Sequence, residues 1–146
     1  MKLSFRPLAA VVFAACAALV GCGPNSKKPE EVADKVFKSI FVEDNFVAAK
    51  PFVSGEAVGK VVERMQEEDK EASKEELQRF REACADAPVV EKRISGADAT
   101  IAYRVTERRT ASLHLIRESG GVWKVDHIKI LRHSADRPDL AVPVRW

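Results

Sequence analysis

The chain has 146 residues, of which 24 are basic and 22 are acidic, and its formal net charge is +2. That length suffices for one domain with one hydrophobic core. The near balance of charge excludes an electrostatic argument for nucleic-acid binding, which depends on a marked basic excess.

The N-terminal segment has the pattern of a secretory leader. Lys2 and Arg6 are its only charges, and an apolar run follows from Leu8 to Val20. A run of that length is too short to span a bilayer, which takes about 20 residues. The next residues, LVGC, resemble the lipobox of bacterial lipoproteins, in which cleavage precedes the cysteine and its sulfur receives a diacylglycerol. The resemblance implies a signal peptide over residues 1–21 and lipidation of Cys22; the alternative is a chance cysteine after an ordinary signal peptide.

Gly23, the residue after Cys22, indicates which membrane would hold this anchor. In Gram-negative lipoproteins an Asp at that position often directs retention in the inner membrane. The resemblance therefore implies the periplasmic face of the outer membrane, with the inner membrane as the alternative. Residues 22–28 are polar with Gly and Pro, which is typical of a tether. Removing Lys2 and Arg6 with the leader leaves 22 basic against 22 acidic residues.

Apolar residues at helical spacing predict a helical half between Pro29 and Pro88. We expect a first helix from Pro29 to about Asp44, a second over Phe46–Lys50, a third capped by Ser54, and a fourth opened by a Ser73/Glu76 capping box. Cys84 lies on the same face of the fourth helix as Leu77 and Phe80. It is therefore expected in the core, with a reactive thiol or an intermolecular disulfide as alternatives. Cys16 leaves with the leader and Cys22 would be lipidated, so no intramolecular disulfide is expected.

The apolar period changes to two after Pro88, which predicts four strands. They cover Val89–Ser95 and the surroundings of Ile101–Val105, Ala111–Leu115 and Trp123–Ile130. The parity slips between Val125 and Ile128, and a bulge near Asp126-His127 would return both to one face. Residues 132–146 have no clean period and are expected to form an extended or partly disordered tail. Helices followed by a meander predict an α+β fold, with the helices on one face of a curved four-stranded antiparallel sheet.

Three stretches of the predicted domain, residues 29–131, resemble a known family. PEEVADKVFKSIFVEDNFVAAKPFVS, GADATIAYRV and ASLHLIRESGGVWKVD are similar to small bacterial lipoproteins of the DUF4878 type, within the NTF2-like (cystatin-like) superfamily. The resemblance implies a cone-shaped α+β domain. Its motifs are structural and not catalytic, so no catalytic residue is carried over.

Enzymes of that superfamily keep their functional side chains inside the cone, and the corresponding candidates for lining a pocket here are Tyr103, His114, Trp123, Asp126 and His127. Each has a plainer interpretation. Tyr103 and Trp123 are expected in the core, His114 alternates with Leu113 and Leu115 and can face solvent, and a bulge accounts for the Asp126-His127 pair. The histidines lack zinc-ligand spacing with Cys84, so no metal or cofactor is expected.

We therefore expect a non-catalytic, lipid-anchored periplasmic domain that binds or scaffolds at the cell envelope. A small apolar ligand held in the cone is the alternative, and an isomerase- or dehydratase-like enzyme is the third.

Residues 22–87 carry 11 basic and 15 acidic side chains, whereas residues 88–146 carry 11 basic and 7 acidic side chains. Besides the membrane, an envelope protein or anionic lipid is thus a possible partner. A filled interior would favour the scaffold, an apolar cavity the ligand, and a buried carboxylate near Tyr103 catalysis.

Overall fold

The computed structural model describes residues 28–133 and the backbone of residues 141–143. The expected signal peptide, Cys22, the tether up to residue 27 and most of the expected tail lie outside the described residues. Within the part that is described, no helix is both long and apolar enough to cross a membrane.

The helical half follows the predicted order. It consists of α1 (Pro29–Phe37), the π-helical turn η1 (Lys38–Val42), α2 (Phe46–Ala49), the 3₁₀ turn η2 (Lys50–Phe52), α3 (Ala57–Asp69) and α4 (Lys74–Ala85). The predicted capping box of α4 is confirmed: Glu76 N–H donates to Ser73 Oγ over 3.2 Å, and Ser73 N–H donates to Glu76 Oε2 over 2.9 Å. These two bonds satisfy backbone donors that the first turn of a helix leaves free.

The prediction that Ser54 caps α3 is wrong. The N-cap of α3 is Glu56, and Gly55 reverses the chain before it with a φ of 72°. Ser54 is used elsewhere: its hydroxyl donates to Glu118 Oε1 over 3.1 Å and its N–H donates to Val125 O over 2.8 Å. A positive φ is readily adopted only by glycine, so the turn at Gly55 directs Ser54 to the sheet and away from the helix.

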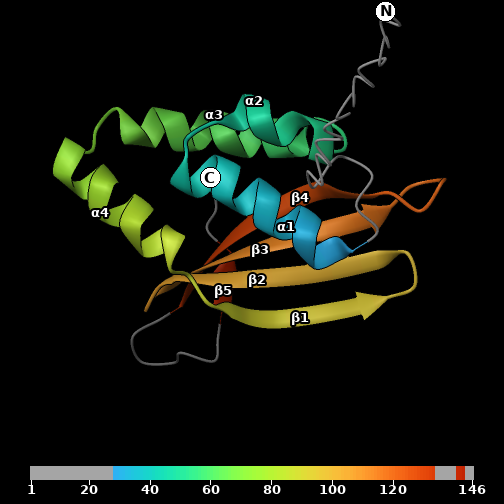
Figure 1. Ribbon diagram of the computed structural model, residues 1–146. Helices are drawn as coiled ribbons and strands as arrows, with labels where there is room; N and C mark the ends of the chain where they lie inside the picture. The colour runs from blue at the N-terminus through green and yellow to red at the C-terminus, as the bar shows by residue number, and fades with distance from the viewer. Residues whose placement is uncertain (1–27, 134–140, 144–146) are drawn as a thin grey trace, which may run out of the picture.

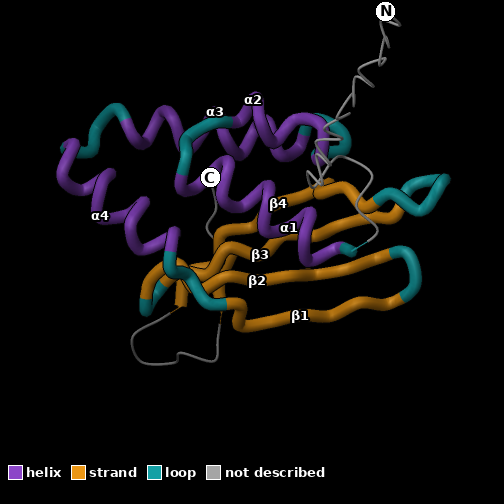
Figure 2. The backbone as a smooth tube through the Cα atoms, in the orientation of Figure 1, coloured by secondary structure: helices purple, strands orange, loops and turns teal. Residues whose placement is uncertain are grey.

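The fold class is confirmed as α+β, with the helices packed on one face of an antiparallel sheet (Figures 1 and 2). The four expected strands are β1 (Val89–Ser95), β2 (Asp98–Thr106), β3 (Arg109–Arg117) and β4 (Trp123–His133). A fifth strand, β5 (Ala141–Pro143), pairs with the end of β4, and the order across the sheet is β1-β2-β3-β4-β5. β5 differs from the extended or partly disordered tail predicted for this region, because three residues ending in proline carry no period of their own.

The predicted bulge in β4 is confirmed. His114 pairs with His127, and the next residue of β3, Leu115, pairs with Val125, so Asp126 is the extra residue. Trp123, Val125 and Ile128 are consequently all buried on the helix side of the sheet. One inserted residue thus places the apolar side chains before and after it on the same face of the sheet.

The core lies between this sheet face and the helices. Its centre contains a stack of aromatic rings: Phe37 lies 4.1 Å from Tyr103 and 4.8 Å from Phe41, measured between ring centroids. α1 and α3 pack against β4, whereas α4 packs against η1 and β2. α4 therefore runs from the end of α3 towards the start of β1, on the same face of the sheet (Figure 1).

Candidate ligand-binding site

Of the five residues predicted from the sequence, two lie in the core. Tyr103 and Trp123 are both buried. The ring of Tyr103 stacks on Phe37, and burial, together with the negative charge of Asp34, raises the pKa of its hydroxyl. Arg117 lies over the ring of Trp123 at 5.7 Å from the centroid. Both aromatic residues therefore have the plainer, structural role.

The other three lie on the opposite face of the sheet, away from the helices. His114 Nδ1 lies 2.6 Å from Asp126 Oδ1, and its Nε2 lies 3.5 Å from Asp98 Oδ1. His127 is the neighbour of His114 across the strands. The side chains of His114 and Asp126 are 40% and 34% exposed, so water screens their pairing. No three histidine, cysteine or acidic side chains of the described part are placed to hold a metal ion.

Cys84 is buried in the core, as predicted. Burial raises the pKa of its thiol from an ordinary value of 9.0 to about 12. Since the thiolate is the reactive form, this cysteine is chemically inert at neutral pH.

A cavity of about 380 Å³ lies between α3, α4 and the adjacent ends of β2, β3 and β4. Most of its lining is apolar, supplied by Phe41, Met65, Ala72, Leu77, Phe80, Val105 and Ile130. None of the five candidate residues lines it, because two are enclosed in the core and three face the other side of the sheet. The lining contains no histidine, cysteine, serine or tyrosine among the described residues.

The cavity arises from the way in which α3 and α4 diverge. On α3 the residues Val58, Val61 and Val62 are buried, but Met65, one turn further along, is only half-buried. On α4 the same is true of Leu77 and Phe80, whereas Cys84 near the end of the helix is buried. Each apolar stripe therefore begins in the core at one end and continues into the cavity at the other.

The mouth of the cavity is polar and mainly acidic, with Glu68, Asp69, Glu76 and Arg109. Glu76 is held by the Ser73 backbone, whose hydrogen bond lowers the pKa of its carboxyl group. Burial and the neighbouring charge of Asp44 raise the pKa of Asp69. Arg81 is bound to Asp44 at 3.0 Å, and Asp69 has no ion pair with any described residue. The charge of Arg81 partly offsets the raised pKa of Asp69, but Arg81 is paired with Asp44 and makes no ion pair with Asp69.

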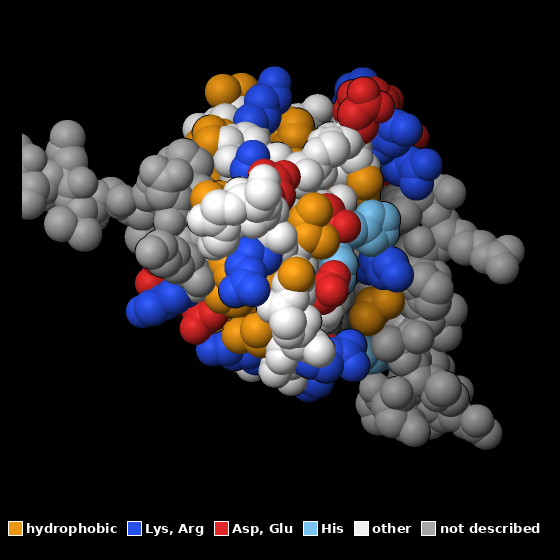
Figure 3. All heavy atoms as spheres, turned by 90° about the vertical axis from the view of Figure 1, so that its right-hand side faces the viewer, with side chains coloured by type: hydrophobic (Ala, Val, Ile, Leu, Met, Phe, Trp, Pro, Cys, Tyr) orange, Lys and Arg blue, Asp and Glu red, His pale blue; other side chains and the backbone are white. Residues whose placement is uncertain are grey.

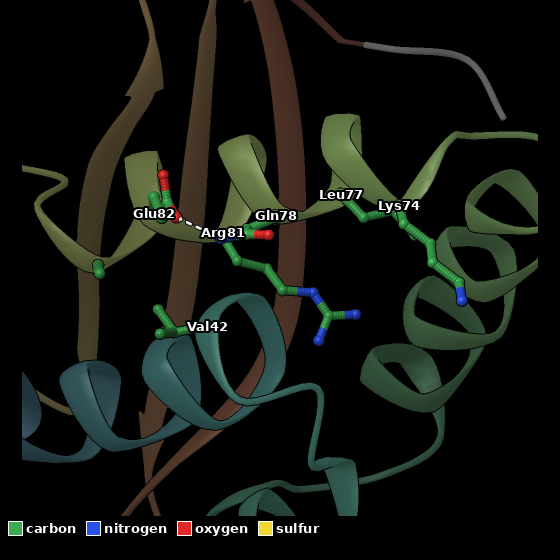
Figure 4. A pocket seen from close by; sticks show the side chains of 7 residues that line it. Val42, Lys74, Leu77, Gln78, Arg81 and Glu82 are labelled. Carbon is green, nitrogen blue, oxygen red and sulfur yellow. Dashed lines mark hydrogen bonds between the residues drawn. The ribbon is translucent and has the colours of Figure 1, made fainter.

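A second, more open hollow lies over the outer side of α4 (Figure 4). Val42, Leu77 and Ala85 form its apolar part, and its charged and polar side chains are Lys74, Gln78, Arg81 and Glu82. Gln78 is bound to Glu82 at 2.9 Å and Arg81 to Asp44 at 3.0 Å, so three of the four polar side chains around this hollow already have a partner. Leu77 lines both spaces, and α4 therefore separates them.

The end of the sheet that carries the β1–β2 and β3–β4 turns shows no single-sign patch. On this face Lys and Arg side chains are interspersed with Asp and Glu (Figure 3). Such a mixture is typical of an ordinary solvated surface.

No protein-family model, curated protein or solved structure matches this chain.

Proposed function

We propose that this chain is a lipid-anchored protein of the periplasmic face of the outer membrane that binds a small apolar ligand in the cavity between α3 and α4. The cavity is the observation that carries the proposal. Its volume of about 380 Å³ falls within the range of about 300–1,000 Å³ that is usual for small-molecule sites. Its apolar lining favours a ligand over the purely scaffolding role expected first from the sequence.

The charge of the mouth favours a ligand with a cationic end. Three of the residues that line the cavity are acidic and one, Arg109, is basic, and Asp69 has no ion pair among the described residues although the charge of Arg81 acts on it. A bound ammonium group would supply a direct counter-charge and favour the ionised form of Asp69. The proposed ligand class is therefore an alkyl or aryl chain that carries an amine.

The decisive experiment compares dodecylammonium with dodecyl sulfate, two amphiphiles of equal chain length and opposite charge. Each is titrated below its micelle concentration, and displacement of N-phenyl-1-naphthylamine from the full chain is followed by fluorescence. We expect tighter binding of the ammonium compound, and Asp69→Asn should remove most of that preference. Equal binding of both compounds would contradict the cationic end.

Filling the cavity separates a specific site from surface adsorption. Met65→Trp places a larger apolar side chain in the cavity and should abolish displacement while the melting temperature stays close to that of the parent. Arg64→Trp is the matched control, because Arg64 is the adjacent residue of α3 and is exposed to solvent. Loss of binding in both variants, or in neither, would count against the cavity as the site.

The lipid anchor rests on the lipobox-like LVGC segment and needs its own test. Cys22→Ser should move the protein from the detergent phase to the aqueous phase, or leave an unprocessed precursor. A mature protein that begins at another residue and carries no acyl mass would refute this part of the proposal. The ligand-binding part would be unaffected by that result.

A further inference from the structure

The two edges of the sheet differ in how they are protected. The β4 edge is covered by β5 over residues 131–133 and by Val53, which bridges to Val125. No described segment pairs with the far side of β1, and all seven of its residues are exposed. Uncovered edge strands are templates for pairing with another strand.

β1 also carries three of the four exposed large apolar side chains among the described residues. Val89, Val90 and Ile94 are 52%, 44% and 47% exposed, and Val47 is the one other large apolar side chain of the described residues in that state. Charged residues occupy the centre of the strand, in the order Glu91, Lys92, Arg93. The edge strand thus combines exposed apolar side chains with a specific order of charges.

The position of the β1–β2 turn determines which backbone groups of β1 are free. Ser95 pairs with Asp98 across the two-residue turn at Gly96, whose φ is 61°. The pair that closes such a turn is hydrogen-bonded, and backbone groups then alternate along the strand. The N–H and C=O groups of Arg93 therefore point to β2, and those of Lys92 and Ile94 point away from the sheet.

We propose that β1 pairs with β1 of a second copy of this chain, antiparallel and centred on Lys92. In that register Glu91 of each copy lies opposite Arg93 of the other, so the exposed pair that Arg93 and Glu91 form within each chain at 3.5 Å would extend into an alternating group of four charges across the twofold axis. The same register brings Val90 next to Ile94 of the second copy, also twice. Opposite charges directly across two strands stabilise their pairing, whereas like charges there destabilise it.

In this register Lys92 lies opposite Lys92 of the second copy. The positive charge of each Lys92 is, however, already paired within its own chain. Lys92 Nζ is bound to Glu30 Oε1 of α1 at 2.9 Å in the same chain. The Lys92 bond is also the main cause of a lowered pKa of Glu30, so the carboxylate is ionised at neutral pH. Two such Glu30–Lys92 pairs would form an alternating group of four charges at the axis instead of an unrelieved contact of two cations.

The charges and the irregularity of β1 also limit which strands can pair with it. Val90 is an extra residue relative to β2, and a bulge of this kind together with central charges discourages indiscriminate edge pairing. Registers centred on Glu91 or Arg93 would oppose like charges. A five-residue edge contact buries less than the roughly 1,200 Å² of a stable interface, so we expect a weak dimer with one register.

Cysteine cross-linking in intact cells tests this register directly. Paired residues at the axis have Cα atoms about 5.5 Å apart, which is within disulfide range, so Lys92→Cys in the full chain should form a covalent dimer on mild oxidation. Glu91→Cys and Arg93→Cys alone should not, because each lies about 8 Å from its own copy across the axis. Co-expression of these last two variants, differently tagged, should give a mixed dimer. The parent chain controls for its native cysteines.

Three outcomes would overturn the proposal. They are the absence of a Lys92→Cys dimer, equal cross-linking of all three single variants, and cross-linking of Lys92→Cys to a different protein only. The last result would indicate that the edge receives a strand from another partner.

Charge reversal provides an independent measurement on the full chain in detergent. Glu91→Arg or Arg93→Glu turns both cross-strand ion pairs into repulsions and should weaken self-association about tenfold or more. The double variant restores opposite charges and should return to within about threefold of the parent. These side chains are exposed and water screens the Glu91–Arg93 pair within each chain, so the melting temperature should change little. Failure of the double variant to recover would also overturn the proposal.

Discussion

His114 and Asp126 meet because Asp126 is the inserted residue of a bulge. Adjacent residues of a regular strand point to opposite faces, yet the bulge leaves Asp126 within 2.6 Å of His114 while His127 is the residue that pairs with His114. The insertion also keeps Val125 and Ile128 on the core side. The presence of a residue at position 126 therefore matters more for folding than the carboxylate that it carries.

Deletion and substitution at this position should have very different effects. Asp126→Asn and His114→Ala remove only a solvent-screened contact and should each cost less than about 1 kcal/mol. Deletion of Asp126 turns either Trp123 and Val125 or Ile128 to the wrong face and should prevent stable folding. Thermal denaturation followed by circular dichroism distinguishes the two cases. A deletion variant that melts like the parent would contradict the role given to the bulge.

Trp123 is expected to be the most sensitive single position in β4. Truncation of a buried aromatic residue costs about 3–5 kcal/mol, out of the roughly 5–15 kcal/mol that stabilises a domain of this size. Trp123→Ala should therefore lower the urea midpoint sharply. Arg117→Ala removes only the contact over the ring and should cost about 1 kcal/mol or less. Similar midpoints for the two variants would show that the ring does not anchor the core.

Cys84 should react with thiol reagents only when the domain opens. Because burial raises the pKa of the thiol to about 12, we expect the native protein to be modified at pH 8 at less than about one hundredth of the rate measured in urea. Mass spectrometry of samples quenched at successive times gives both rates. Rapid native labelling would restore the alternative of a reactive thiol.

The raised pKa values of Cys84 and Tyr103 also predict a loss of stability at alkaline pH. Each group ionises more readily in the unfolded chain than in the folded one, so the unfolded state binds fewer protons above the ordinary thiol pKa of 9.0. Stability should therefore be unaffected by these groups below about pH 8 and should fall as the pH rises from there towards 12.

The double variant Cys84→Ala/Tyr103→Phe isolates this effect. It should be less stable than the parent at pH 7, because it loses buried atoms, but its melting temperature should fall less between pH 8 and pH 10.5. Parallel declines in the two proteins would mean that other groups determine the alkaline sensitivity.

The sequence predicts the features that depend on local pattern. The capping box at Ser73, the parity of the strands and the bulge at Asp126 each follow from residues within a few positions of one another. Three features depend on tertiary structure and cannot be predicted from local patterns. Ser54 binds β4 because of the turn at Gly55. The position of β5 depends on where the chain returns to the sheet, and the cavity depends on how far α4 lies from α3. The apolar stripe of Met65, Leu77 and Phe80 is visible in the sequence, but its incomplete burial is a property of the packed helices.

The bridge between Val53 and Val125 has a consequence for the order of folding. It joins the segment before α3 to a strand that is synthesised much later. α1 and α3 both pack against β4, so their apolar faces have no complete partner until that strand has been made. The helical half should thus expose its apolar faces until β4 joins it, and a chain truncated after β3 should be degraded rapidly by proteases.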